Sequence, residues 1–133
     1  MTENPIDTFV NGWTDDPQVR EAFIQLRTIL EEKSGVTLEF ISREGVSHSL
    51  RAVRQGQIRP IFALVDIIED TPRWLSVCFY EDTIDDPDGM GNLVPSGILG
   101  EDGYCFDVEG YDEGQLAYLE IRIDEAYASA VGF

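Results

Sequence analysis

The stretch RPIFALVDIIEDTPRWLSVCFY, residues 59–80, decides the fold of this chain of 133 residues. It holds two apolar runs, residues 61–68 and 74–80, each interrupted by a single polar residue. Neither run alternates polar with apolar residues, which is typical of strands that are covered on both faces. The polar residues between them, 69–73, include Pro72 and have the length of a hairpin connection. The stretch therefore predicts an antiparallel hairpin through the core.

Helices and further strands flank this hairpin along the chain. Apolar residues recur at helical spacing over 17–33 and again from Asp112 to about Ala130. Residues 36–42 alternate with a period of two and predict a strand. The other candidates are a strand or a capped helical turn at 46–53, a strand that begins near Ile58 with Pro60 at an edge or bulge, and a strand at 104–108.

These elements predict an α+β fold, with an antiparallel meander sheet of about five strands flanked by an N-terminal and a C-terminal amphipathic helix. We expect residues 1–133 to form one domain, because no repeat or linker composition divides them. Two segments lie outside the regular elements. Residues 1–14 form a loose arm or a short helix capped at Asn4, and residues 81–97 form a long acidic loop rich in Asp, Gly and Pro.

The apolar character of the central strands predicts that both faces of the sheet are covered. Two helices on one face would leave the other face in need of cover. The candidates for that cover are the N-terminal arm, the long loop and another copy of the chain. The last of these predicts a homodimer.

The net charge of the chain is −17 at pH 7 and is unevenly distributed. Residues 1–73 hold 8 basic and 12 acidic residues, whereas residues 74–133 hold 1 basic and 14 acidic residues. A negative field disfavours direct binding to nucleic acid and to anionic membrane surfaces, because both are bound through Lys and Arg. The same field attracts cations and basic proteins, so we expect a protein partner of basic character.

Two further features predict a cytoplasmic protein. The first residues carry neither the basic nor the apolar region of a cleaved signal peptide, and no apolar run approaches the ~20 residues of a membrane span. The two cysteines, Cys78 and Cys105, each lie in an apolar run, as expected of buried free thiols in a reducing compartment.

Acidic residues concentrate in the loop after residue 80, where the candidate metal ligands are Asp82, Asp85, Asp86 and Asp88. Clustered carboxylates near a glycine suit a hard cation such as Ca²⁺ or Mg²⁺. The fit to the calcium-loop pattern is poor, because aligning Gly89 with its sixth position leaves Ile84 at the first ligand position. The alternative is a solvated, negatively charged loop.

Basic residues concentrate between positions 43 and 59, and the candidates for binding an anion or a partner are Arg43, His48, Arg51, Arg54 and Arg59. The planar guanidinium group binds carboxylate or phosphate with two hydrogen bonds. If residues 46–53 form a strand, Arg51 faces one side of the sheet while His48 and Arg54 face the other. The alternative is that these arginines only neutralise the protein's own carboxylates.

His48 and Asp66 are the other titratable residues of interest. His48 is the only histidine, so a catalytic relay would have to use it, with Ser47, Ser49, Cys78 or Cys105 as the nucleophile. No nucleophile-elbow motif supports such a relay. Asp66 interrupts a core strand, and burial would raise its pKa unless Arg59, Arg73 or backbone donors pair with it.

No motif in the sequence is specific for a catalytic or a binding function. Composition and charge favour a small acidic binding or assembly module that is not an enzyme, with the acidic C-terminal half facing the partner. The alternative is an enzyme in which the acidic loop holds a divalent metal and Arg43 or Arg51 binds an anionic substrate. That alternative requires the loop and the basic segment to lie side by side.

Overall fold

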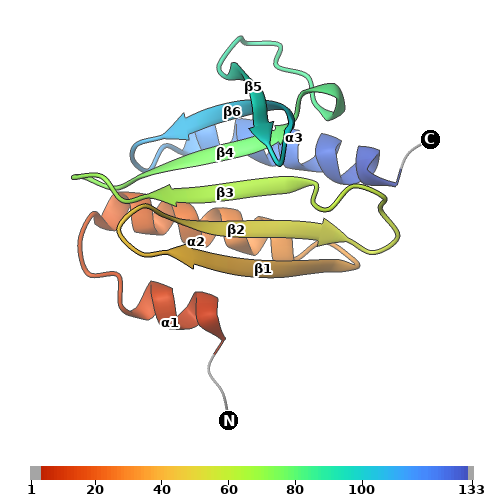
Figure 1. Ribbon diagram of the computed structural model, residues 1–133. Helices are drawn as coiled ribbons and strands as arrows, with labels where there is room; N and C mark the ends of the chain where they lie inside the picture. The colour runs from red at the N-terminus through yellow and green to blue at the C-terminus, as the bar shows by residue number, and fades with distance from the viewer. Residues whose placement is uncertain (1–3, 132–133) are drawn as a thin grey trace.

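A computed structural model describes residues 4–131 and shows an α+β fold, as predicted. Figure 1 shows one sheet with α2 and α3 behind it and α1 beside β1. The described residues form α1 (Pro5–Asn11), α2 (Pro17–Glu31), β1 (Val36–Arg43), β2 (Ser47–Arg54), β3 (Ala63–Ile68), β4 (Trp74–Tyr80), the 3₁₀ turn η1 (Glu81–Thr83), β5 (Asn92–Ile98), β6 (Glu101–Val108) and α3 (Glu113–Ala130). Residues 1–3 of the predicted N-terminal arm lie outside the described residues.

Capping residues explain where the first and last helices begin. Asn4 Oδ1 accepts a hydrogen bond from the backbone N–H of Ile6 at 2.8 Å, and Pro5 follows at the first helical position. The arm is therefore a short capped helix, one of its two predicted forms. Asp112 Oδ1 accepts from the N–H of Gln115 at 3.0 Å and begins α3.

The strand order in the sheet is β1-β2-β3-β4-β6-β5, and all neighbouring pairs are antiparallel. The first four strands form the predicted meander with its β3–β4 hairpin, and residues 47–54 are a strand rather than a helical turn. The meander ends at β4, because β6 pairs with β4 and β5 lies outside β6. The sheet of the described residues thus has six strands instead of about five.

The start of β3 differs from the prediction. The strand begins at Ala63 rather than near Ile58, whose side chain is 99% exposed. Pro60 has no N–H for a strand ladder, and the residues before Ala63 form a turn instead. The first apolar residue of the segment therefore faces solvent.

The loop predicted at 81–97 is shorter than expected, because its second half forms the edge strand β5. The prediction missed this strand since Pro95 and Gly97 are residues typical of turns. The pairing of β5 with β6 is also irregular, with a shift of register between Val94 and Ile98. Bulges of this kind are common in edge strands.

The two faces of the sheet are covered differently. The three helices pack on one face and enclose the main core, which includes Phe23, Phe79 and Phe106. A second, smaller core lies on the opposite face beside β5 and consists of Ile61, Leu64, Cys78, Tyr80, Ile98 and Cys105. The segment predicted as the long loop therefore covers part of the second face, whereas α1 packs on the helix face.

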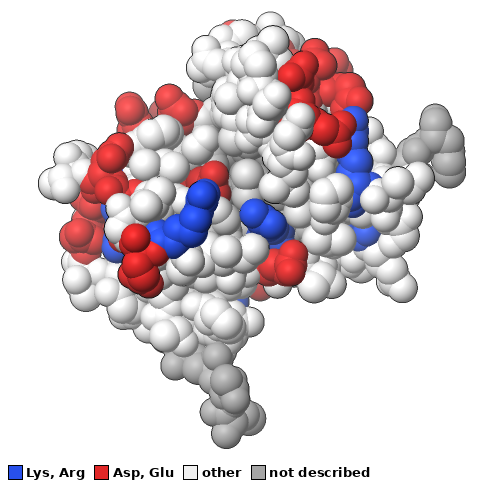
Figure 2. Space-filling model, viewed as in Figure 1, with Lys and Arg blue, Asp and Glu red and all other residues white. Residues whose placement is uncertain are grey.

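The rest of that second face carries the odd-numbered side chains of β1 and β2 and the even-numbered side chains of β3 and β4, as the pairing register requires. We call it the open face. It is turned toward the viewer in Figures 1 and 2.

The expectation of two free cysteines is wrong for this structure. Cys78 and Cys105 are directly opposite residues of β4 and β6, and their sulfur atoms form a disulfide. Local sequence does not predict this pairing, because it depends on β6, rather than β5, lying next to β4. Both residues are buried, as expected.

Candidate functional site

The acidic loop is held in place by Asp86. Its carboxylate accepts hydrogen bonds from the hydroxyls of Tyr118 and Tyr104 and from the backbone N–H groups of Met90 and Gly91. Burial opposes ionisation of Asp86, but these four donors outweigh it and lower its pKa well below the usual range. Asp86 therefore anchors the loop to β6 and α3.

The other candidate metal ligands are spread apart. Asp82 forms two hydrogen bonds with the guanidinium group of Arg59, at 2.8 and 2.9 Å, and Arg59 also binds Glu101 at 3.0 Å. Asp85 and Asp88 are exposed, and their backbone N–H groups donate to Glu125 and to the Tyr118 hydroxyl, respectively. Within residues 4–131 no three acidic, histidine or cysteine side chains converge as a metal site. A metal at this loop stays a prediction.

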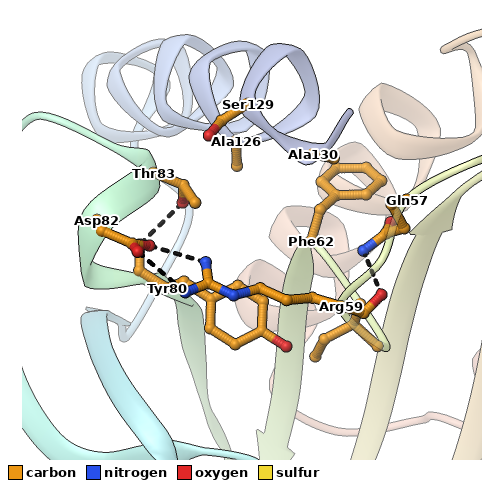
Figure 3. Close-up of a pocket in the computed structure, with 10 residues that line it drawn as sticks. Gln57, Arg59, Phe62, Tyr80, Asp82, Thr83, Ala126, Ser129 and Ala130 are labelled. Atoms are coloured by element: carbon orange, nitrogen blue, oxygen red, sulfur yellow. Dashed lines mark hydrogen bonds and ion pairs between the residues drawn. The ribbon is translucent and has the colours of Figure 1, made fainter. Parts of the chain in front are cut away.

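A small cavity lies beside Arg59 at the end of the sheet (Figure 3). Figure 3 shows Arg59 extended across the ring of Tyr80 toward Asp82, with Ala126 and Ser129 of α3 on the opposite side. The guanidinium carbon is 4.2 Å from the centre of the Tyr80 ring. The cavity measures about 100 Å³, the volume of a few water molecules and below that of typical sites for organic ligands. Arg59 is thus engaged by the protein's own carboxylates and ring.

His48 belongs to a buried network on the helix face. Its Nε2 lies 3.2 Å from Glu69 and its Nδ1 2.9 Å from the hydroxyl of Ser42. Since a carboxylate can only accept, Nε2 donates to Glu69. The ring also packs against Phe9 and Phe40.

The order Ser42, His48, Glu69 resembles a nucleophilic relay that the sequence prediction missed, because the serine lies on β1 and not beside the histidine. Two observations favour a structural role instead. Glu69 is also bound by Arg73, whose hydrogen bonds lower its pKa and weaken its pull on the His48 proton. The imidazole packs against the rings of Phe9 and Phe40. The network joins α1 to β1, β2 and the connection between β3 and β4.

Arg54 also has a partner within the protein. Its Nη1 donates to the backbone carbonyl of Tyr127 at 2.7 Å, and its guanidinium lies 3.9 Å from the centre of the Tyr127 ring. This contact holds the last turn of α3 against β2. The predicted split of the basic candidates between the two faces is confirmed, since His48 and Arg54 lie on the helix face.

Arg43 and Arg51 lie on the open face, and neither forms an ion pair within 4 Å among the described residues. Arg43 Nη2 reaches Ser47 Oγ only at 3.5 Å, and Arg51 Nε is buried without a hydrogen-bond partner. The other Lys and Arg side chains bind a carboxylate or a backbone carbonyl: Arg20, Arg27, Lys33, Arg54, Arg59, Arg73 and Arg122.

Asp66 lies on β3, and its level along the strands is halfway between those of Arg43 on β1 and Arg51 on β2. Ser49 Oγ donates to Asp66 Oδ1 at 2.5 Å across the β2–β3 pair, and Ser76 is the neighbour on β4. Burial raises the pKa of Asp66, while Ser49 and the charges of Arg43 and Arg51 partly offset that rise. The predicted partners Arg59 and Arg73 are wrong for Asp66, because both bind other carboxylates.

Figure 2 shows two separate basic groups in the middle of the open face, with acidic groups beside them. Ser47 and Ser49 are only 5% and 6% exposed. The open face therefore combines two buried serine hydroxyls, a half-buried carboxylate and two guanidinium groups that form no ion pair among the described residues. It is the candidate site that the geometry brings together.

Comparisons with protein-family models, curated proteins and solved structures find no match for this chain. None of the helices within residues 4–131 is long and apolar enough to span a membrane. The function must therefore be argued from the open face itself.

Proposed function

We propose that this protein is a non-enzymatic binding or assembly module that holds a protein partner on its open face. The observation that carries the proposal is the state of Arg43 and Arg51. The chain has 26 acidic residues and 9 basic ones, so an arginine without a carboxylate partner is unexpected. A guanidinium group that is not needed within the fold is free to bind an acidic group of a partner.

The partner is basic in net charge, in keeping with the field of a chain that carries −17. That field acts during approach and raises the rate of association. Contacts at the open face are short-range, because a Debye length of about 8 Å at physiological ionic strength screens the distant carboxylates. A partner that is basic overall and offers acidic side chains to Arg43 and Arg51 satisfies both conditions. A cytoplasmic location belongs to the same proposal.

The enzymatic alternative has less support from the geometry. It requires Arg43 or Arg51 beside the acidic loop, but these arginines are on β1 and β2, whereas the loop follows β4 on the far side of β3. Asp82 and Asp86 are already held by Arg59 and by two tyrosines. We therefore favour a binding function over a catalytic one.

The proposal is tested on an array of extended peptides of varied charge, probed with the wild-type protein and with R43Q, R51Q and R59Q. The three variants lose the same charge, but Arg59 lies away from the open face and binds Asp82 and Glu101. We expect R43Q and R51Q to weaken the strongest peptide signals while R59Q leaves them unchanged. An equal effect of all three variants, or no peptide bound at low salt, would contradict the proposal.

A further inference from the structure

The positions of Arg43, Asp66 and Arg51 on the open face define the spacing of a ligand. Arg51 pairs with Glu39, four residues before Arg43 on β1, so the two arginines differ in level by about 13 Å at about 3.3 Å per residue. Asp66 pairs with Ser49, which pairs with Ile41, halfway between those two levels. Arg43 is on β1, Asp66 on β3 and Arg51 on β2, which lies between them. A positive, a negative and a second positive group thus follow one another in level along β2, and Arg43 and Asp66 each contact a serine of that strand.

An extended chain laid along these strands matches this spacing. Alternate side chains of an extended segment point to the same side, so residues i, i+2 and i+4 all face the sheet. Residues i and i+4 are also about 13 Å apart, which brings them to the levels of the two arginines. Residue i+2 lies over the pair formed by Asp66 and Ser49.

The chemistry of each position follows from its partner on the sheet. Acidic side chains at i and i+4 complement the positive charges of Arg43 and Arg51, neither of which is in an ion pair among the described residues. An acidic side chain at i+2 would face Asp66, whereas a hydrogen-bond donor there finds the carboxylate oxygen that Ser49 does not bind. The pattern reads the same in both chain directions.

We propose that the open face recognises an extended segment of the partner that carries acidic side chains four residues apart and a hydrogen-bond donor, such as lysine, midway between them. This inference rests on the proposed function, because it names the segment that the module binds. It requires the bound segment to be extended and its two acidic side chains to be four residues apart.

The test uses three peptides of identical composition: Glu-Thr-Lys-Thr-Glu, Glu-Thr-Thr-Lys-Glu and Thr-Glu-Lys-Glu-Thr. The second moves the lysine to the opposite side of the extended chain, and the third brings the acidic side chains two residues apart. Dissociation constants are measured by fluorescence anisotropy of dye-labelled peptides at low and physiological salt. We expect the first peptide to bind roughly tenfold more tightly than the others, the ratio that about 1.4 kcal/mol produces.

Variants separate this inference from the proposed function. R43Q and R51Q should each weaken the first peptide, whereas D66N should reduce the difference between the first and second peptides. If the three peptides bind with equal affinity and R43Q and R51Q still lower that affinity, the proposed spacing of the ligand's charges is wrong but the proposed binding function stands. If R43Q and R51Q bind the peptides as tightly as the wild type does, the proposed binding function of the open face is also wrong.

Discussion

The hydroxyl of Ser49 donates to Oδ1 of Asp66 at 2.5 Å across the β2–β3 pair. Burial raises the pKa of Asp66, and the hydrogen bond from Ser49 partly offsets that rise. A half-buried acid at the centre of a sheet face costs stability when ionised, unless a ligand or the neighbouring arginines compensate it. The free energy of unfolding of the ligand-free protein should therefore depend on the ionisation of Asp66.

The variant D66N should be more stable than the wild-type protein near neutral pH. Because the pKa of Asp66 is raised in the folded state, wild-type stability falls as pH rises from about 4 through the folded-state pKa, and the amide removes that loss. Thermal unfolding at pH 4 and pH 7.5 measures the difference, which should be larger at pH 7.5. The variant S49A is the matched control, and it should lose about 1–2 kcal/mol at pH 7.5 by leaving a buried acceptor unpaired. A D66N protein no more stable than the wild type at pH 7.5 would contradict this account.

The variant D86N should lower the melting temperature by several degrees at pH 7, because four donors bind the ionised carboxylate of Asp86. The pKa of Asp86 is lowered in the folded state, so this stabilisation is present above pH about 4 and is lost as pH falls below it. Melting curves from pH 7 to pH 2.5 should show the two proteins converging in acid. The control D88N, at an exposed position of the same loop, should match the wild type throughout. Equal melting temperatures of D86N and D88N at pH 7 would rule out the anchor.

The network around His48 is predicted to be structural. The variant H48A should lose about 2–4 kcal/mol, since it removes a buried ring packed against Phe9 and Phe40. The variant S42A should lose less than about 1 kcal/mol, because Ser42 is exposed. Chemical denaturation measures both values. Labelling of Ser42 by a fluorophosphonate at a rate above that of other surface serines would instead support a nucleophilic relay.

Alternation along β2 was enough to predict that Arg51 faces one side of the sheet and His48 and Arg54 the other, because alternation depends on the backbone alone. The partner of Asp66 was not predictable in this way. Ser49 becomes its neighbour only through the register between β2 and β3, which follows from the turn at 55–62. The tyrosines that bind Asp86 come from β6 and α3, and no local pattern connects them with the acidic loop.

The structure at the edge of the sheet was also not predictable from local sequence. β5 contains Pro95 and Gly97, so its local sequence favours a loop, and pairing with β6 decides its structure. The disulfide between Cys78 and Cys105 was missed for a related reason, because it requires β6 to lie next to β4. Local periodicity predicted the central strands well, whereas contacts between distant segments required the three-dimensional structure.

The most direct test of the central claim is an NMR titration of ¹⁵N-labelled protein with the peptide Glu-Thr-Lys-Thr-Glu. We predict the largest amide shift changes on the open face, at Arg43, Ser49, Arg51 and Asp66, and their loss in R43Q and R51Q but not in R59Q. Shift changes concentrated at the acidic loop or around the cavity beside Arg59, or none at millimolar peptide, would contradict the assignment of the open face as the binding site.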